Sequence, residues 1–312
     1  MINTEYHSPV LLSECLDALI WNASGTYADC TLGGGGHSIE ILKRLAPDGR
    51  LHCFDRDPEA IAFATKRLAE FKDKVIFHPV AFSCLGSELP ANSLCGVLYD
   101  LGISSHQVDD SARGFTFNGS TPLDLRMDTR SAFSAQEWLR STSEDDMARA
   151  FRDNADLERA YKLTKKIQEL LLAKPSEKIL PEDLRSAVDS TFPDKRRDLN
   201  GILARVFQAI RMEVNGELGE IRTSLRSAVN CLVPGGRLVV ISYHSVEDRC
   251  VKTTAAEFEK DCICPERLPV CQCGGGHRKL TKWNRKPILP SGEEIARNPR
   301  ARSAKLRVYE KV

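Results

Sequence analysis

The chain has 312 residues and a nearly balanced charge, with 44 Lys and Arg against 43 Asp and Glu. Its length allows one elaborated domain or two domains. No apolar run reaches the roughly 18 to 20 residues that span a bilayer. The start of the chain carries acids and has neither the basic region nor the small-residue cleavage site of a secretory signal. We therefore expect a cytoplasmic protein without a membrane-spanning segment.

The basic residues are concentrated near the C-terminus. Residues 277–312 hold eleven Lys or Arg and three Glu, a net charge of +8, which leaves −7 for residues 1–276 because the whole chain carries +1. The simpler interpretation is a solvated surface. The alternative is a surface that contacts the phosphates of a nucleic acid.

The first third of the chain alternates strand and helix signals. Apolar runs bounded by turn residues predict strands at 25–31, 50–55, 74–78 and 93–100. Amphipathic stretches predict helices at 37–45 and 58–71, the second with a proline at its first turn. This succession, with its short turns, predicts a parallel, doubly wound α/β sheet.

A helical block interrupts this pattern. Helix signals alone fill residues 131–214, at 143–154, 157–173, 181–191 and 199–214. Strand signals return at 235–242 and 305–311, with a helix at about 246–259 between them. We therefore expect residues 1–107 and 215–312 to form the core and residues 108–214 to form an inserted all-helical domain.

A glycine run follows the first predicted strand. Gly33 to Gly36 lie between that strand and the next helix, where residues without side chains let a ligand approach the backbone and the helix N-terminus. Asp55 ends the second predicted strand, and a carboxylate there can accept hydrogen bonds from both ribose hydroxyls of an adenosine. Glycines also collect in ordinary loops, but this order of strand, turn, helix and acid predicts a nucleotide site.

Two cofactors compete for this site. A dinucleotide fingerprint requires a third glycine where this chain has Ser38, and the sequence contains no G-x-x-x-x-G-K-[ST] motif. S-adenosylmethionine has no diphosphate to bind and requires the acid on the second strand. Its methyl group would lie over the end of the fourth strand, where Asp100 closes the apolar run. The sequence therefore favours S-adenosylmethionine over a nicotinamide dinucleotide.

Longer motifs carry a resemblance that covers essentially the whole chain. They are HSPVLLSECL, DCTLGGGGHS, DRDPEAI, DLGISSHQ with the following DD and RGF, PLDLRMD, PGGRLVVISYHSVEDR and NPRARSAKLR. Through these motifs the chain resembles the MraW family, the ribosomal RNA small subunit methyltransferases H. The resemblance implies the class I S-adenosylmethionine-dependent methyltransferase fold with a helical insertion. It also implies methylation of the exocyclic amine of one cytidine in the decoding region of 16S ribosomal RNA, a cytosine-N(4)-methyltransferase activity.

The resemblance further implies which residues bind the cofactor. Carried over by motif, they are Gly35, Gly36, His37, Asp55, Phe82, Asp100 and Gln107. For Asp100 the alternatives stay open. It could hold the positively charged amino acid portion of the cofactor, bind the target amine as a catalytic residue, or cap the next helix.

A cytosine amine is a poor nucleophile because its lone pair is delocalised into the ring. Catalysis then consists mainly of holding that nitrogen about 3 Å from the methyl group and accepting its proton. Amino methyltransferases of the DNA type grip the base with Asp/Asn-Pro-Pro-aromatic, but this chain has DLGI at 100–103. We consider Phe115, Phe117 and Tyr243 as substrate-stacking rings, although an aromatic ring more often belongs to the core.

Polar residues follow the strand predicted at 235–242. His244 and Ser245, with Glu247 and Asp248, could orient the target base or relay a proton, and we include the first two as catalytic candidates. The alternative is that Ser245 and Asp248 cap the helix that begins there.

The loop before the helical block supplies further substrate candidates. Arg113, Asp124 and Arg126 could shape an RNA cleft or could only pair with each other. The inserted helical domain, with its DKRRD turn at 194–198, would then serve RNA recognition, although most such charge runs are solvated surface.

Four of the eleven cysteines lie within twelve residues, at Cys262, Cys264, Cys271 and Cys273. Four thiolates suit tetrahedral zinc, yet the usual spacing has two residues inside each pair rather than one. A structural zinc is one interpretation and a redox-labile loop is the other. The remaining seven cysteines occur singly, and we expect them to fill the core.

Three classes of function follow from the sequence. The favoured class is a methyltransferase acting on 16S ribosomal RNA within the small ribosomal subunit. A non-catalytic ribosome assembly factor that binds S-adenosylmethionine is the alternative, and a nicotinamide oxidoreductase is opposed by Ser38 and by the basic C-terminal segment. A homodimer remains open.

Overall fold

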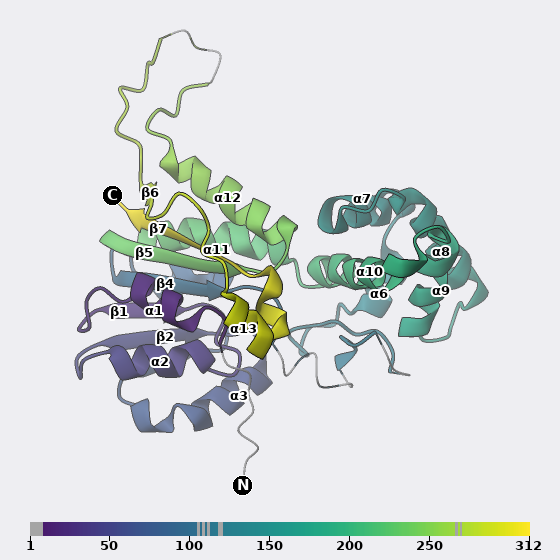
Figure 1. The fold of residues 1–312 in the computed structure, drawn as a ribbon, viewed down its shortest axis with the longest axis horizontal. Helices are drawn as coiled ribbons and strands as arrows, with labels where there is room; N and C mark the ends of the chain where they lie inside the picture. Colours follow the sequence, from purple (N-terminus) through teal and green to yellow (C-terminus); the bar gives the residue numbers. More distant parts are fainter. Residues whose placement is uncertain are drawn as a thin grey trace. The chain divides into compact units, whose positions relative to one another are not determined.

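The computed structural model describes residues 9–104, 107, 110, 113–117, 121–265, 268 and 270–312. The chain forms two compact units (Figure 1). Residues 1–102 together with 218–312 form the sheet unit, and residues 103–217 form the helical unit. The sequence puts the boundaries after residues 107 and 214, whereas the structure divides the chain after residues 102 and 217.

A seven-stranded sheet is the centre of the sheet unit, with the strand order β3-β2-β1-β4-β5-β7-β6. The strands are β1 (Thr26–Asp29), β2 (Arg50–Phe54), β3 (Val75–His78), β4 (Leu94–Asp100), β5 (Leu232–Ser242), β6 (Leu280–Lys282) and β7 (Lys305–Lys311). Strands β1 to β5 pair with one another in parallel. Strand β7 pairs antiparallel with both β5 and β6. The chain order reverses at β1, which lies between β2 and β4. The predicted doubly wound α/β fold is confirmed.

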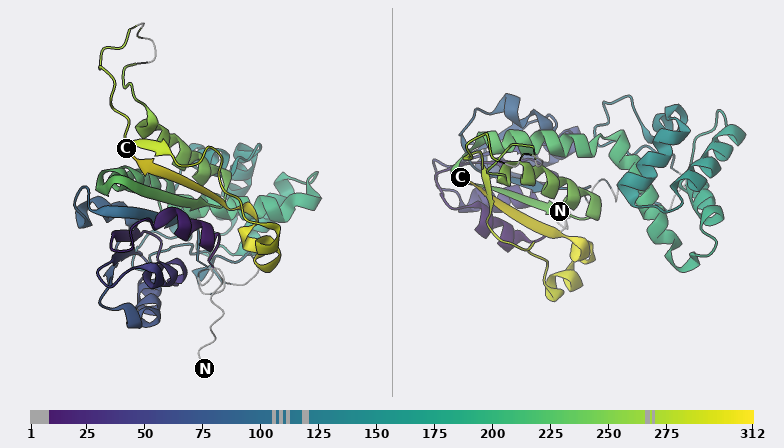
Figure 2. Two further views of the ribbon diagram at one scale, coloured as in Figure 1. Left: turned by 60° about the vertical axis from the view of Figure 1, so that its left-hand side comes forward. Right: turned by 90° about the horizontal axis from the view of Figure 1, so that it is seen from above.

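Helices cover both faces of this sheet (Figure 2). One face carries α1 (Leu12–Leu19), α2 (Gly36–Arg44) and α3 (Pro58–Arg67), and the other carries α4 (Leu85–Glu88), α11 (Glu217–Cys231) and α12 (Ser245–Glu259). Along β4, Leu98 packs in the hydrophobic cluster under α1, α2 and α3, while Val97 and Tyr99 pack in the cluster under α4, α11 and α12. Successive residues of a strand point to opposite faces, so a run that is apolar at every position is buried on both sides. The shorter elements of this unit are η1 (Ala69–Phe71), η2 (Phe82–Cys84), α13 (Gly292–Arg297) and η5 (Pro299–Ser303).

The helical unit has its own hydrophobic core. The helices for which the structure gives bounds in this unit are α6 (Ala135–Ser141), α7 (Glu144–Ala155), α8 (Ala160–Ala173), α9 (Pro181–Thr191) and α10 (Leu199–Val214), with the short η4 (Arg196–Asp198). In α10, Ile202, Val206 and Ile210 are buried together because residues four apart lie on one side of a helix. Ser143 caps α7 by accepting a hydrogen bond from the Asp146 N–H, as its Ser-x-x-Asp sequence predicts.

The seven single cysteines lie in or against the core of the sheet unit. Six of them are buried, namely Cys15, Cys30, Cys53, Cys95, Cys231 and Cys250, and Cys84 is half-buried. Burial raises the pKa of the Cys15, Cys30 and Cys53 thiols well above the ordinary value, so these groups stay protonated and inert.

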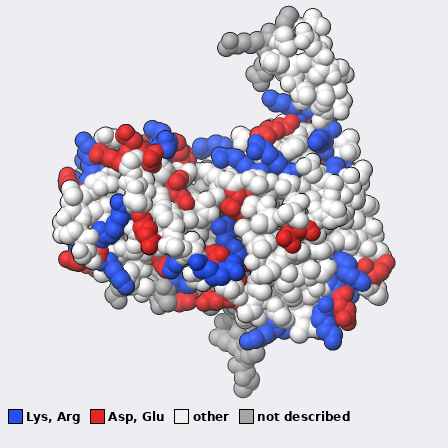
Figure 3. Space-filling view, turned by 180° about the vertical axis from the view of Figure 1, so that it is seen from behind, with Lys and Arg blue, Asp and Glu red and all other residues white. Residues whose placement is uncertain are grey.

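The surface carries charges of both signs. Figure 3 shows Lys and Arg interspersed with Asp and Glu on the face turned to the viewer. In the part of the chain that the structure describes, no helix combines the length and the apolar character needed to traverse a bilayer.

Candidate functional site

The glycine turn Gly33–Gly36 follows β1 at the edge of the sheet where the parallel strands end. Gly33 and Gly35 have φ angles of 48° and 73°, a region that side chains with a Cβ atom rarely adopt. Gly36 opens α2, and a Cβ atom there would come within 2.8 Å of Pro9 Cγ. The turn therefore requires glycine both for its backbone conformation and for its close packing.

Asp55 directly follows β2 and is bonded to this turn. Its Oδ2 atom accepts a hydrogen bond of 2.8 Å from the Gly33 N–H, and its Oδ1 atom accepts one of 2.9 Å from the Asp57 N–H. Desolvation outweighs these bonds and raises the pKa of Asp55 to about 6. The carboxylate is thus held at the strand end with lone pairs left for a further donor.

Asp100, the last residue of β4, is the centre of a second network. Its Oδ1 atom accepts a hydrogen bond of 2.7 Å from the Tyr243 hydroxyl, and its Oδ2 atom lies 3.5 Å from His37 Nδ1. Its backbone N–H donates to Thr31 Oγ1 at 2.6 Å. The Asp100 side chain keeps 26% of its surface exposed, so the carboxylate is oriented by these partners and still accessible.

Two more acids lie near Asp100. Asp29 ends β1 and is buried, with its Oδ2 atom accepting a 2.7 Å hydrogen bond from Ser38, and Glu247 of α12 is fully buried. Burial is the main cause that raises the pKa values of both Asp29 and Asp100, and the charges of Asp29 and Glu247 raise that of Asp100 further. This edge of the sheet therefore concentrates negative charge and favours a cationic ligand.

Sequence reasoning missed Asp29, Thr31 and Ser38 as parts of this site. A signal for Asp29 exists in the sequence, because it is a lone acid at the last position of its strand, as Asp100 is in β4. The dinucleotide fingerprint identifies Ser38 only as a missing glycine, whereas in the structure its hydroxyl donates a hydrogen bond to Asp29.

His244 and Ser245 lie at the start of α12. His244 is the N-cap residue, since its Nδ1 atom accepts from the Glu247 N–H at 3.4 Å, and its Nε2 atom lies 2.8 Å from Glu247 Oε1. Asp248 pairs instead with Arg307, at 2.5 Å and 3.1 Å. The alternative that Ser245 and Asp248 cap this helix is therefore wrong, because the histidine ring takes that position.

Phe82 and Gln107 complete the expected cofactor set. Phe82, in η2 after β3, meets Tyr99 edge to face at 5.8 Å between ring centroids, and the Arg56 guanidinium lies 6.0 Å from the Phe82 centroid. Gln107 belongs to the helical unit, where it is buried and its Oε1 atom accepts from the Ser104 N–H at 3.1 Å. The other six residues of the set lie in the sheet unit.

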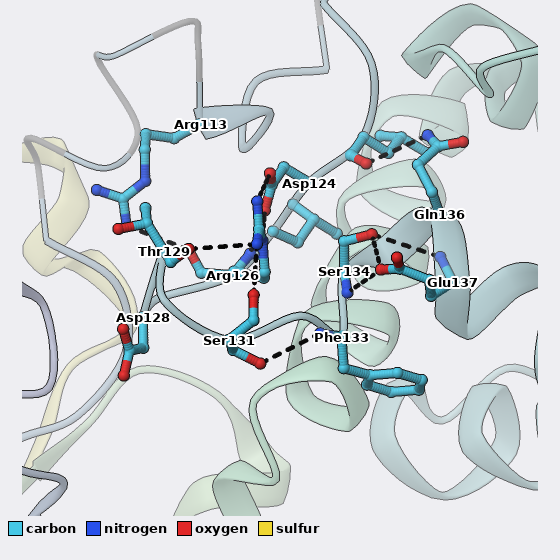
Figure 4. Close-up of polar contacts among 12 residues, drawn as sticks. Arg113, Asp124, Arg126, Asp128, Thr129, Ser131, Phe133, Ser134, Gln136 and Glu137 are labelled. Carbon is cyan, nitrogen blue, oxygen red and sulfur yellow. Dashed lines mark hydrogen bonds and ion pairs between the residues drawn. The ribbon is translucent and has the colours of Figure 1, made fainter.

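The loop before α6 holds the charged substrate candidates, all in the helical unit (Figure 4). Arg126 forms a bidentate pair with Asp124, with both N–O distances at 2.7 Å. Arg113 is buried and donates to the backbone oxygens of Arg126 and Met127 at 3.1 Å and 2.8 Å. Burial opposes ionisation of Asp124, but the hydrogen bonds and charge of Arg126 hold its pKa below the ordinary value. These side chains stabilise their own loop, and their contribution to an RNA cleft stays a prediction.

The rings proposed to stack on a base differ in exposure. Phe115 is only 5% exposed and packs in the core of the helical unit, so its expected role as a stacking surface is not supported. The cause is that Phe115 belongs to the same apolar cluster as Leu123 and Trp138. Phe117 is 37% exposed and meets Phe207 edge to face, and Tyr243 is half-buried beside Asp100.

The four clustered cysteines lie between α12 and β6. Their Sγ atoms all lie within 4.8 Å of one another, as one metal ion would require, and they are part of the sheet unit. None of them is among the residues of the two networks around Asp55 and Asp100.

The class of protein follows from this geometry. The sheet is doubly wound, and its β7 lies antiparallel next to β5. A glycine turn follows β1, and acids stand at the ends of β2 and β4. Together these features define the class I S-adenosylmethionine-dependent methyltransferase fold. The family model described as MraW methylase family matches residues 4–312. The chain belongs to this family.

Curated relatives resemble the chain over its whole length. Ribosomal RNA small subunit methyltransferase H of Clostridioides difficile strain 630 is 42% identical over 311 residues, which cover 98% of this chain and 99% of that protein. The proteins of the same name from Heliobacterium modesticaldum and Ruminiclostridium cellulolyticum are 41% and 42% identical, again over 98% of this chain and 99% of the relative.

Proposed function

We propose that this protein methylates the RNA of the small ribosomal subunit with S-adenosylmethionine as methyl donor. The observation that carries the proposal is the bond between Asp55 and the glycine turn, which holds a carboxylate beside an open backbone at the end of β2. Membership of the MraW methylase family and the names of the curated relatives support the same reaction.

The residues present fit S-adenosylmethionine better than a dinucleotide. Asp29, Asp100 and Glu247 make this edge of the sheet acidic, which suits the positive sulfonium and ammonium groups of S-adenosylmethionine. The same acids would repel the diphosphate of a nicotinamide dinucleotide. Ser38, buried against Asp29, also takes the position of the third fingerprint glycine.

Each cofactor residue has a defined chemical task in this proposal. Asp55 accepts hydrogen bonds from the ribose hydroxyls, and the turn that contains Gly35 and Gly36 brings the N-terminus of α2 next to the nucleoside. Phe82 offers its ring to the adenine, and Asp100 with His37 orients the amino acid portion. When bound, S-adenosylmethionine would supply a methyl group attached to a positively charged sulfonium sulfur, which would leave as a neutral thioether when the carbon–sulfur bond breaks.

The finer proposal is that the acceptor is the exocyclic amine of a cytidine in the decoding region of 16S ribosomal RNA. Such an amine requires placement more than activation, and it loses a proton as the new carbon–nitrogen bond forms. Asp100 is suited to accept this proton because its pKa lies above the ordinary value. Tyr243, bonded to Asp100, holds that carboxylate in position.

Base stacking is assigned to Tyr243 or Phe117 in this proposal. Both rings are accessible, whereas Phe115 is buried. We expect Phe117→Ala to reduce methyl transfer while S-adenosylmethionine binding persists, and Tyr243→Ala, which also removes the hydrogen bond to Asp100, to reduce both transfer and binding. Wild-type transfer rates in both variants would exclude the two rings as stacking surfaces.

The proposal includes a cytoplasmic location and the small subunit as partner, since the substrate RNA is found there. Zinc takes no part in the transfer, because the four-cysteine cluster contributes no residue to the proposed cofactor site. The alternative, a non-catalytic assembly factor, predicts cofactor binding without turnover.

Titration calorimetry on protein freed of carried-over ligand tests the proposal. We expect one S-adenosylmethionine per chain and no measurable binding of a nicotinamide dinucleotide. Binding of the dinucleotide alone, or of neither compound, would refute the proposed function.

A further inference from the structure

The hairpin between α12 and β6, described at residues 261–265, 268 and 270–279, extends away from the rest of the sheet unit (Figure 1). It holds Cys262, Cys264, Cys271 and Cys273, whose Sγ atoms lie within 4.8 Å of one another. We propose that these four sulfurs bind one Zn²⁺ ion, which gives the hairpin its folded form. This site is separate from the proposed methyl transfer and does not depend on it.

The sulfur positions fit a tetrahedral ion. With a Zn–S distance of about 2.3 Å, the sulfurs at the corners of a tetrahedron lie about 3.8 Å apart. Three of the pairs here measure 3.5 Å for Cys262–Cys271, 3.6 Å for Cys271–Cys273 and 3.7 Å for Cys273–Cys262. A disulfide would instead bring two sulfurs to about 2.05 Å and separate them from the others. One shared ion explains three nearly equal distances.

The backbone around Cys264 is arranged for a thiolate. The N–H groups of Gln272 and Cys273 both point at Cys264 Sγ, each at 3.2 Å. Two N–H groups converging on one sulfur stabilise negative charge, as the outer partners of metal ligands do. The segment Cys271 to Cys273 therefore contributes two sulfurs to the cluster and two backbone N–H groups that donate to the Cys264 sulfur.

The glycines after the second pair bring the chain back to the stem of the hairpin. Gly274, Gly275 and Gly276 have φ angles of 78°, 74° and 75°, which three consecutive residues with side chains would not adopt. The Gly276 and His277 N–H groups then donate to Asp261, at 3.2 Å and 3.1 Å. The two ends of the hairpin are thereby closed next to the cysteine cluster.

In this proposal a metal ion stabilises the hairpin in place of buried apolar contacts. Ile263 and Val270 are 61% and 71% exposed, so the described part of the hairpin does not bury these apolar side chains in a core of its own. Figure 3 shows its visible surface as largely uncharged. Small segments without a core are commonly stabilised by a structural metal. Soft thiolates select zinc over magnesium or calcium.

Metal analysis of the full-length protein tests the proposal. The protein is purified under reducing conditions without chelator and without a metal-affinity step. We expect about one zinc per chain in the wild type and in Cys84→Ser, and loss of most of that zinc in Cys264→Ser. Less than about a tenth of an equivalent in the wild type, iron in place of zinc, or full zinc in Cys264→Ser would overturn the proposal.

A second measurement does not rely on a variant. Co²⁺ is added to chelator-treated wild-type protein, and we expect the visible absorption bands of tetrahedral thiolate coordination, reversed by an excess of Zn²⁺. Absence of these bands in protein whose circular dichroism matches that of the untreated sample would overturn the site. Neither experiment measures methyl transfer, so the zinc site and the proposed function can fail separately.

Discussion

Asp55 shows how one residue couples the strand end to the cofactor turn. Its two carboxylate oxygens are already bonded to the backbone of Gly33 and Asp57, so the side chain is preorganised before any ligand binds. Preorganisation increases affinity because less ordering remains to be done on binding. The affinity for S-adenosylmethionine should therefore depend strongly on this carboxylate.

We expect Asp55→Asn to weaken S-adenosylmethionine binding roughly ten- to hundredfold. The reason is the loss of charged hydrogen bonds, which contribute about 1.5–3 kcal/mol. Titration calorimetry measures the change, with Asp17→Asn as the matched control because Asp17 is an exposed acid on α1. Equal affinities for wild type and Asp55→Asn would contradict the assignment.

The pKa of Asp55 also predicts how stability varies with pH. Burial raises this pKa to about 6, above the value of about 3.9 in an unfolded chain. The folded state then binds the proton more tightly, so this group's contribution to stability is complete below about pH 4 and is lost as pH rises through about 6.

We therefore expect Asp55→Asn to become more stable relative to wild type between about pH 4 and 6, with no further change above that range. Urea unfolding at several pH values measures the difference in the free energy of unfolding. A difference that stays constant from pH 4 to 7 would show that the carboxyl group is not perturbed.

Among the elements, the junction of α10 and α11 contains a buried ion pair. Arg211 and Glu217 meet at 2.7 Å and 2.8 Å, and their side chains are only 9% and 7% exposed. Removing one partner leaves a buried charge, which is more costly than removing both.

We expect Arg211→Met to reduce the free energy of unfolding by about 3–5 kcal/mol, and the double variant Arg211→Met/Glu217→Leu to recover most of it. Arg226→Met is the control, because Arg226 and Glu257 form an exposed pair worth about 1 kcal/mol or less. Equal losses in Arg211→Met and Arg226→Met would contradict the role of burial. Urea denaturation of the three variants provides the measurement.

Elements with strong local signals were predicted well from the sequence. The bounds of α9, α10 and β7 agree with the predicted 181–191, 199–214 and 305–311, because proline, turn residues and periodic apolar positions mark their ends. The sequence did not predict α1, α4, α11, α13 or β6, and it predicted α6 only as part of the helical block 131–214. β6 has three residues, too few for any periodicity, and it forms by pairing with β7, a contact that no local pattern reveals.

The sequence predicts the part of the site whose residues follow successive strands of the sheet. The glycine turn, Asp55 and Asp100 follow parallel strands of one sheet, so their common edge could be inferred. The pairing of Asp100 with Tyr243, the bond between Ser38 and Asp29, and the burial of Phe115 depend on tertiary packing. Sequence spacing carries no information about such contacts.

At the scale of the whole molecule, charge separates along the chain although the total is near zero. Residues 277–312 carry a net +8, and three of their arginines, Arg297, Arg300 and Arg302, are exposed on α13 and η5. The proposed RNA substrate would bring phosphates to such a surface.

Replacing Arg297, Arg300 and Arg302 together by Gln should weaken RNA binding and reduce its dependence on salt. Each lost phosphate contact lowers the slope of log K against log salt by about 0.7–0.9. Binding of small-subunit RNA at several salt concentrations gives the slope, with Arg44→Gln on α2 as the control. An unchanged slope would show that this surface is only solvated.

The most direct test of the account is methyl transfer itself. The protein is incubated with S-adenosylmethionine labelled in its methyl group and with small ribosomal subunits that lack the modification, and the labelled nucleoside is identified by mass spectrometry. The account predicts a single cytidine methylated on its exocyclic amine. A ring-methylated nucleoside, or no labelled RNA despite S-adenosylmethionine binding, would contradict it.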